Sequence, residues 1–299
     1  MAKILLTGGT GLIGTHLQKL FHQNDHEVVI LTRSPKNDNH FKWDIHKKFI
    51  DEKAFIGVDY IIHLAGAGIA DSRWTAIRKK ELIDSRVLSA DLLYAYVKKL
   101  NIKLKGFISA SGIGFYGAIN SDHIFTEKDP PENDFISEIC VKWEDAANQF
   151  KQLDIPVTCL RTGVVLSAKG GALEKMNTPL FLSALGTGKQ YVPWIHINDL
   201  CELYLKAIED TDFKGIYNGV APEHQTNLDF TKKLGKTLKK PVMPFNVPEF
   251  MLKIILGELA VIILKGSRIS SQKTTNKYKF EFSNLDEALL NIYNKKEVV

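Results

Sequence analysis

A glycine-rich stretch near the start of the chain limits the folds that this sequence can adopt. A short apolar run at residues 4–6 is followed by three spaced glycines and then by apolar residues at helical spacing. Glycines can form a tight turn, let a phosphate approach the backbone and let a helix pack closely on a strand. The start of the helix also offers unpaired N–H groups to an anion. The order strand, turn and helix predicts a dinucleotide-binding turn with contacts at Gly8, Thr10, Gly11, Leu12, Ile13 and Gly14.

The end of the second predicted strand indicates which dinucleotide is bound. Residues 28–33 have the pattern of a buried strand, and Thr32, Arg33 and Ser34 lie where NAD-binding folds usually carry a carboxylate. A guanidinium and hydroxyls would bind a 2′-phosphate, so we predict NADP(H) as the cofactor, with an exposed loop arginine as the alternative. Asp44 ends a third strand, where it could meet the adenine edge or simply lie in a turn.

The alternation of strands and helices over residues 1–166 predicts the fold class. We expect an α/β protein with a Rossmann-type doubly wound parallel sheet and a smaller α-rich C-terminal lobe. Ligands bind beyond the carboxyl ends of such strands, so Leu64, Ala65 and Gly66 should line the cofactor. We place the Rossmann domain at residues 1–240, with a substrate-lobe insertion at about 167–195, and the lobe at residues 241–299.

Composition argues against several kinds of partner. The 39 basic and 34 acidic residues give a net charge of +5, and no basic run is interleaved with aromatic residues, so we expect no nucleic-acid partner. The three cysteines and nine histidines show no ligand spacing, which predicts no metal site. The most apolar stretch, residues 250–265, carries charges and is too short to span a bilayer comfortably. With a strand starting at residue 3, we expect no signal peptide, no membrane partner and a cytoplasmic protein.

Several motifs spread along the chain carry a family resemblance. They are His63-Leu-Ala-Gly66, Arg73-Trp74, Ser85-Arg86, Ser109-Ala-Ser111, Tyr116-Gly117 and Trp194-Ile-His-Ile-Asn-Asp199. Together with the glycine turn, these motifs resemble the extended short-chain dehydrogenase/reductases and, within these, the atypical NAD-dependent epimerase/dehydratase, or nucleoside-diphosphate-sugar epimerase-like, subfamily. The resemblance implies a Rossmann core that contacts NADP(H) through Thr32, Arg33, Leu64, Ala65, Glu81, Arg86 and Val165. From the sequence pattern alone, Glu81 and Arg86 would be surface residues.

The superfamily's acid/base pair is missing from this chain. In the superfamily, a tyrosine followed four residues later by a lysine exchanges a proton with the substrate. If Lys142 is aligned with that lysine, Glu138 replaces the tyrosine. If the helix is aligned on Glu144 instead, Ile136 and Cys140 occupy the two positions. Neither alignment supplies the tyrosine.

Two functions therefore stay open at the level of sequence. In a hydride-transfer enzyme, Ser111, or Ser109 if the loop is offset, would bind the substrate oxygen. Tyr116, Glu138 or Lys142 would then handle the proton, although a packed aromatic and a surface ion pair are equally ordinary readings of these residues. The alternative is a non-catalytic NADP(H)-binding regulator that reports redox state to a partner.

A small carbonyl, an alcohol or a nucleotide-sugar is the expected substrate of the enzyme. Its candidate contacts lie outside the cofactor-binding motifs, and they are Arg73, Trp74, Trp194 and His196. His196 could instead be a core histidine at a helix entry. The sequence does not distinguish a monomer from a homodimer.

Overall fold

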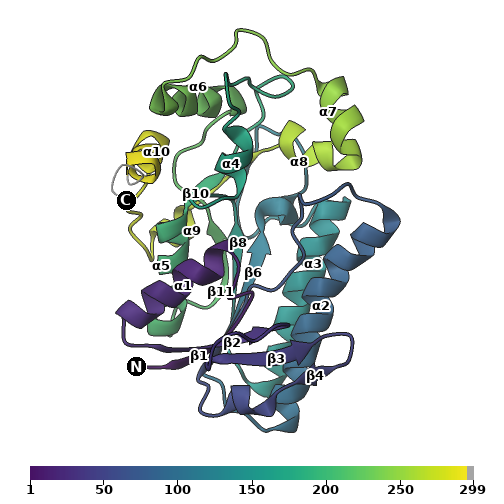
Figure 1. Ribbon diagram of the computed structural model, residues 1–299, viewed down its shortest axis with the longest axis vertical. Helices are drawn as coiled ribbons and strands as arrows, with labels where there is room; N and C mark the ends of the chain where they lie inside the picture. The colour runs from purple at the N-terminus through teal and green to yellow at the C-terminus, as the bar shows by residue number, and fades with distance from the viewer. Residues whose placement is uncertain (295–299) are drawn as a thin grey trace.

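The centre of the molecule is an eight-stranded sheet, seen in a computed structural model that describes residues 1–294 (Figure 1). The strand order is β11-β8-β6-β5-β1-β2-β3-β4, and only the β3–β4 pair is antiparallel. The strands are β1 (Lys3–Thr7), β2 (Glu27–Thr32), β3 (His40–Asp44), β4 (Phe49–Ile50), β5 (Tyr60–His63), β6 (Gly106–Gly112), β8 (Val157–Thr162) and β11 (Gly215–Gly219). Strand order reverses between β1 and β5, which confirms the predicted doubly wound sheet.

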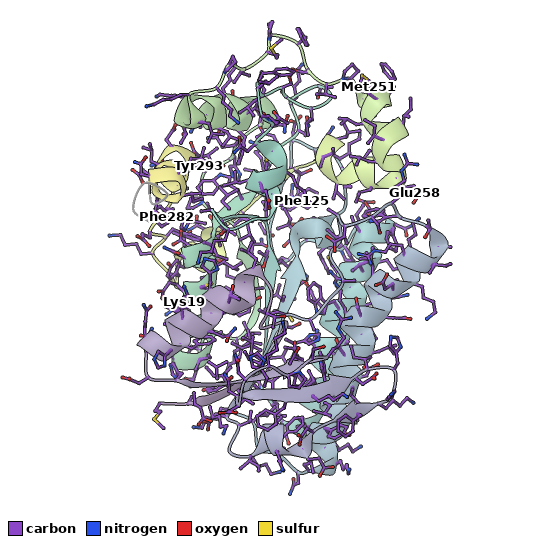
Figure 2. The ribbon with its side chains drawn as sticks, in the orientation of Figure 1. Lys19, Phe125, Met251, Glu258, Phe282 and Tyr293 are labelled. Atoms are coloured by element: carbon purple, nitrogen blue, oxygen red, sulfur yellow. The ribbon has the colours of Figure 1, made fainter. Side chains whose placement is uncertain are left out.

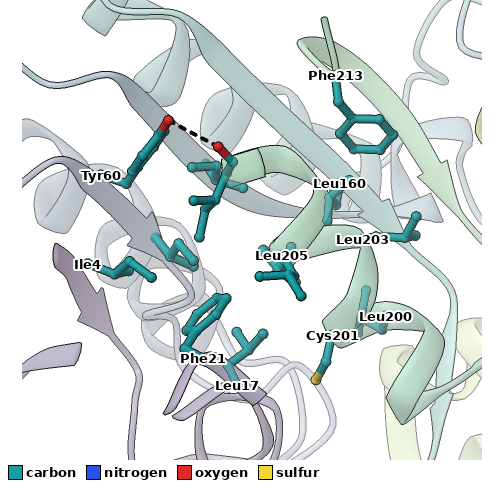
Figure 3. Packing of buried hydrophobic residues seen from close by; sticks show 14 of the residues in the cluster. Ile4, Leu17, Phe21, Tyr60, Leu160, Leu200, Cys201, Leu203, Leu205 and Phe213 are labelled. Atoms are coloured by element: carbon teal, nitrogen blue, oxygen red, sulfur yellow. Dashed lines mark hydrogen bonds between the residues drawn. The ribbon is translucent and has the colours of Figure 1, made fainter. Parts of the chain in front are cut away.

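Helices cover both faces of this sheet. Helices α1 (Leu12–Gln23) and α5 (Ile197–Glu209) lie on one face, and α2 (Ala76–Lys99) and α3 (Phe135–Asn148) lie on the other. Alternate residues of β1 enter the two cores: Ile4 packs beneath α1 and α5, whereas Leu5 packs beneath α2. Figure 3 shows the first core, in which the Tyr60 hydroxyl donates to the Ile208 carbonyl at 3.1 Å. Burial on both faces explains the continuous apolar runs of these strands.

The remaining elements form the smaller helical lobe and its connections. Two parallel pairs join β9 (Val164–Leu166) to β10 (Trp194–His196) and β7 (Ile124–Phe125) to β12 (Arg268–Ile269). The helices are α4 (Ala172–Met176), α6 (Asn227–Leu238), α7 (Glu249–Leu256), α8 (Val261–Leu264), α9 (Gln272–Thr275) and α10 (Leu285–Asn294). Short 3₁₀ helices are η1 (Glu52–Phe55), η2 (Ile113–Tyr116), η3 (Gln149–Leu153) and η4 (Gly257–Ala260). Helix α6 shares a core with α10, and the domain boundary at residue 240 stays a prediction.

Two polar joints attach the C-terminal segment to the sheet domain. The Arg73 guanidinium, in the loop before α2, donates from Nε to the Ile255 carbonyl at 2.8 Å and so closes the end of α7. The fully buried Asp199 carboxylate accepts from the Tyr278 hydroxyl at 2.8 Å and from the backbone N–H groups of residues 281 and 282. Phe282 is labelled beside this second joint in Figure 2.

Within residues 1–294, no helix combines the length and apolarity that crossing a membrane requires.

Candidate functional site

The glycine turn has the geometry that its sequence predicts. Gly8 has a φ of +68°, and a Cβ placed on it would lie 3.0 Å from the Leu64 carbonyl carbon. A Cβ on Gly14 would lie 2.5 Å from the Gly9 Cα, so α1 can pack this closely only with glycine there. Gly11 precedes α1, and none of the described side chains caps that helix. The first N–H groups of α1 are therefore available to an anion.

Thr7 ties the turn to the loop after β5. Its Oγ1 accepts hydrogen bonds from the backbone N–H groups of Leu64 and Ala65, both at 3.1 Å. On the other side, a Cβ on Gly171 would lie 3.3 Å from the Leu12 side chain, and the half-buried Val165 packs on the core beneath α1. The ends of β1, β5 and β9 therefore meet around the turn, at the crevice where a doubly wound sheet binds ligands.

The residues after β2 lie at the same edge of the sheet. Arg33 is exposed, and the Ser34 N–H donates to the Thr32 hydroxyl at 3.3 Å. No ion pair within residues 1–294 involves Arg33. Asp44 accepts from the Lys47 N–H at 3.0 Å, which lowers the pKa of its carboxyl, so its side chain lies in a turn, the second of the two readings of the sequence.

Arg86 is buried beside the cofactor loop, and its assignment to the surface from pattern alone is wrong. Its Nη atoms donate to the carbonyls of Leu82 at 2.8 Å and Ala67 at 3.1 Å, and the guanidinium lies 4.6 Å from the Trp143 ring centre. Its Nε has no hydrogen-bond partner, and no carboxylate of the described chain pairs with it. Burial lowers the pKa of Arg86 to about 10. Glu81, in contrast, is exposed and pairs with Arg78 at 2.7 Å.

Helix α3 presents no acid/base pair to the end of β6. A Cβ on Gly112 would lie 3.5 Å from the Cys140 Sγ, and one on Gly114 would lie 2.7 Å from Ile136. Burial raises the pKa of the Cys140 thiol to about 12. This geometry matches the alignment on Glu144, in which Ile136 and Cys140 occupy the positions of the superfamily's tyrosine and lysine. The other candidates, Glu138 and Lys142, form a 2.7 Å ion pair on the exposed face of α3, as the surface ion-pair interpretation of their spacing predicts, and their catalytic role stays a prediction.

Ser111 and Tyr116 belong to one buried network. Ser111 donates to a Glu144 carboxylate oxygen at 2.7 Å, and Glu144 pairs with the Arg161 guanidinium through two bonds of 2.8 Å. Arg161 also donates to the Tyr116 hydroxyl at 3.0 Å, and that hydroxyl donates to Asn218 at 2.7 Å. All five residues are more than nine-tenths buried, and burial raises the pKa of Tyr116 to about 12. Both hydroxyls are therefore hydrogen-bonded within the protein interior, and their catalytic roles stay predictions.

The four predicted substrate contacts are also engaged within the protein. Trp194 is fully buried, and His196 is 2% exposed with its ring 3.9 Å from that of Phe282, so both side chains pack in the core and their contact with substrate stays a prediction. His196 accepts from the Asn198 N–H at 3.1 Å and caps α5. Trp74 is buried, and its Nε1 donates to a carbonyl of its own loop, whereas Arg73 binds α7 as described above.

His63, at the end of β5, is held neutral in the core. Its Nε2 lies 2.7 Å from the Ser89 hydroxyl, and its Nδ1 accepts from the Trp143 indole N–H at 3.3 Å. Burial lowers the pKa of His63 to about 3. No pattern in the sequence distinguishes it from a histidine on the cofactor loop.

This neutral histidine predicts a pH dependence of stability. Below about pH 6.5, His63 is protonated in the unfolded chain but stays neutral in the folded protein. The free energy of unfolding therefore falls as the pH drops. Between pH 7 and pH 5 we expect His63 to account for about 2 kcal/mol of the loss. Urea unfolding at pH 7 and at pH 5 should show a smaller loss of unfolding free energy in His63→Gln than in the wild type. The exposed His22→Gln variant is the control, and equal losses in both variants would contradict this assignment.

Taken together, the turn, the strand order and the crevice define a dinucleotide-binding Rossmann-type protein. A family model described as the NAD dependent epimerase/dehydratase family matches residues 4–218, and one for a domain of unknown function, DUF1731, matches residues 247–292. The chain belongs to the NAD-dependent epimerase/dehydratase family.

Comparison with individual proteins agrees with this membership. The chain is 33% identical over 295 residues to the epimerase family protein Mb2239 of Mycobacterium bovis, covering 96% of each chain. The solved structure of the human epimerase family protein SDR39U1 with NADPH is similar with a TM-score of 0.85 at 29% identity, covering 98% of this chain and 99% of that one. A nucleoside-diphosphate sugar epimerase from Corynebacterium glutamicum is similar at 28% identity and a TM-score of 0.79, covering 97% and 58%.

Proposed function

We propose that this protein is an NADP(H)-dependent oxidoreductase or an enzyme of the epimerase/dehydratase type, and that it acts on a small carbonyl, alcohol or nucleotide-sugar. The observation that carries the proposal is the open start of α1 above a turn in which Gly8 and Gly14 leave no room for a Cβ. Arg33 supports the choice of a cofactor with a 2′-phosphate, because its exposed guanidinium follows β2 and forms no ion pair with any carboxylate of residues 1–294. The NADPH in the human relative's structure agrees with this choice of cofactor.

Arg86 provides an independent test of the fit to a dinucleotide. A buried guanidinium without a counter-ion is unfavourable unless an anion or a strong hydrogen-bond acceptor completes the site. If Arg33, which follows β2, binds the 2′-phosphate, the adenosine half of the cofactor would lie on the β2 side of β1. The nicotinamide half of the cofactor would then lie on the other side, towards β5 and β6. Arg86 contacts the loop after β5, and we assign it to the nicotinamide half.

The proposed roles of the residues follow from these positions. The glycine turn and α1 bind the pyrophosphate, Arg33 binds the 2′-phosphate, and the Leu64–Ala65 backbone, fixed by Thr7, borders the cofactor. When bound, the cofactor supplies a hydride donor or acceptor. None of Ser111, Tyr116, Glu138 and Lys142 is proposed as the proton donor, because the first two are committed to the core and the others face solvent.

Fluorescence titration with NADPH and NADH tests the proposal. We expect NADPH to bind at least about tenfold more tightly, a difference of about 1.4 kcal/mol. Arg33→Ala should remove most of this preference without weakening NADH, since NADH has no 2′-phosphate. If neither dinucleotide binds, the proposed function fails. If Arg33→Ala binds NADPH as the wild type does, the assignment of the 2′-phosphate fails.

A second candidate function is a non-catalytic NADP(H)-binding regulator. It is favoured by the side chains of Ile136 and Cys140 at the end of β6, neither of which exchanges protons near neutral pH. A regulator that reports redox state must bind NADPH and NADP⁺ with different affinities, because a ligand shifts a conformational equilibrium only by its differential affinity. Parallel titrations with the two forms test this candidate, and equal affinities would exclude it.

A further inference from the structure

The helical lobe exposes an unusual amount of apolar surface. Of the fourteen large apolar side chains that are exposed among the described residues, seven lie in two short segments of the chain. Six of them are 45–78% exposed: Leu180, Phe181, Phe245, Phe250, Ile254 and Ile255. The seventh, Met251, is labelled at the outer end of α7 in Figure 2. We call these seven residues the apolar end.

The two segments adjoin in space. Leu182 forms a parallel bridge with Val242, with backbone hydrogen bonds of 2.9 Å to Pro241 and 2.8 Å from Met243. Leu180 and Phe181 therefore lie beside the chain that leads through Phe245 into α7. On α7, the exposed apolar residues at positions 250, 251, 254 and 255 share one face, while Leu252 is buried on the other. A helix that is apolar on both faces is normally covered on both.

The same region carries the positive charge of the protein. Residues 232–265 contain seven lysines and two glutamates, a net charge of +5, whereas the rest of the chain has 32 basic and 32 acidic residues. Lys232, Lys236 and Lys239 are exposed at helical spacing along α6 and its end. Both glutamates are already paired, Glu249 with Lys253 at 2.7 Å and Glu258 with Lys79. Figure 1 places α6 and α7 at the same end of the molecule, opposite β4.

We propose that the apolar end docks on a bilayer surface that carries anionic lipid headgroups. Phenylalanine and isoleucine side chains enter the boundary between headgroups and acyl chains, and the α6 lysines bind the headgroups. Lysine is depleted at protein–protein interfaces, whereas lysine beside exposed aromatic and aliphatic residues is typical of membrane-binding surfaces. Peripheral docking requires no spanning helix. It departs from the sequence-based expectation of no membrane partner, and it does not depend on the proposed function.

Sedimentation of the full-length protein with lipid vesicles tests the proposal. We expect binding to phosphatidylcholine vesicles that contain phosphatidylserine, little binding to phosphatidylcholine alone, and weakening by added salt. Ile254→Asp should lower the bound fraction at limiting lipid about tenfold. The matched control is Ile77→Asp, a substitution of an isoleucine that is 83% exposed on α2, which should bind as the wild type does.

The charge contribution is tested in the same assay. Replacing Lys232, Lys236 and Lys239 together by glutamate should lower binding at least about tenfold, because each basic residue near an anionic surface contributes about a fivefold change. The same replacement at the exposed Lys19, Lys98 and Lys151 is the control. Binding to neither vesicle, or unchanged binding of Ile254→Asp, would overturn the proposal. A dimer in solution that Ile254→Asp converts to a monomer would also overturn it, by assigning the apolar end to a second copy.

Discussion

Arg161→Met is expected to lower the free energy of unfolding by about 3–5 kcal/mol. The Glu144 carboxylate, which is 4% exposed, would keep the Ser111 hydroxyl as its one hydrogen-bond partner among residues 1–294, and Tyr116 would lose a donor. A buried charge without its partner costs far more than an ordinary lost hydrogen bond. Urea unfolding at neutral pH, with the wild type in parallel, measures the difference.

Helix α3 supplies the control for this experiment. Its second ion pair, between Glu138 and Lys142, has each side chain about half exposed, so Lys142→Met should cost less than about 1 kcal/mol. Each variant removes the cation of a pair whose carboxylate lies on α3, and the two pairs differ in burial. Equal losses would show that the Glu144–Arg161 pair contributes no more than a surface pair.

Arg86→Met is expected to weaken NADPH binding by more than about tenfold while leaving 2′,5′-ADP binding unchanged. The analogue contains the 2′-phosphate but lacks the nicotinamide half, to which we assign Arg86. Because the substitution also removes the hydrogen bonds from Arg86 to the Leu82 and Ala67 carbonyls, a thermal melt checks that the loss of binding does not reflect unfolding. Calorimetric titrations measure the binding of NADPH and of 2′,5′-ADP, and a thermal melt measures the stability of the variant.

Arg33→Ala is the matched comparison, since it should weaken both ligands. If Arg86→Met weakens 2′,5′-ADP as much as NADPH, the side chain supports the whole crevice and the assignment to the nicotinamide half is wrong. If the wild type binds neither ligand, the proposed function itself fails, so the two failures can be told apart.

The sheet and the glycine turn could be predicted because their signals are local. Apolar strands, turn glycines and helical spacing follow each other within about a dozen residues, and each constrains its own segment. The side-chain roles could not be predicted in this way. Whether Glu138 or Cys140 faces β6 depends on how α3 is oriented about its own axis relative to the sheet. The sequence of a single helical turn does not determine that orientation. Arg86 looked like a surface residue because the loop at Ala67 and the Trp143 ring of α3, which cover it, come together only in the folded chain.

Long-range partners account for the other differences. Glu144 and Arg161 are seventeen residues apart on different elements, and neither sequence neighbourhood indicates their pairing. Trp194 and His196 looked like candidates for substrate contacts because indole and imidazole groups often bind ligands. Segments far along the chain, including Phe282, cover them instead.

The Arg73 joint has a consequence for attempts to divide this protein. A fragment ending near residue 240 would keep Arg73 but lose the α7 carbonyls that it binds, and it would uncover Trp74 and Leu82, which pack with Leu259. The complementary fragment, from about residue 241 onwards, would contain α7 without the Arg73 guanidinium that donates to the carbonyls at its end. The two family models match residues 4–218 and 247–292, and we expect neither segment to keep its native packing when it is separated from the other.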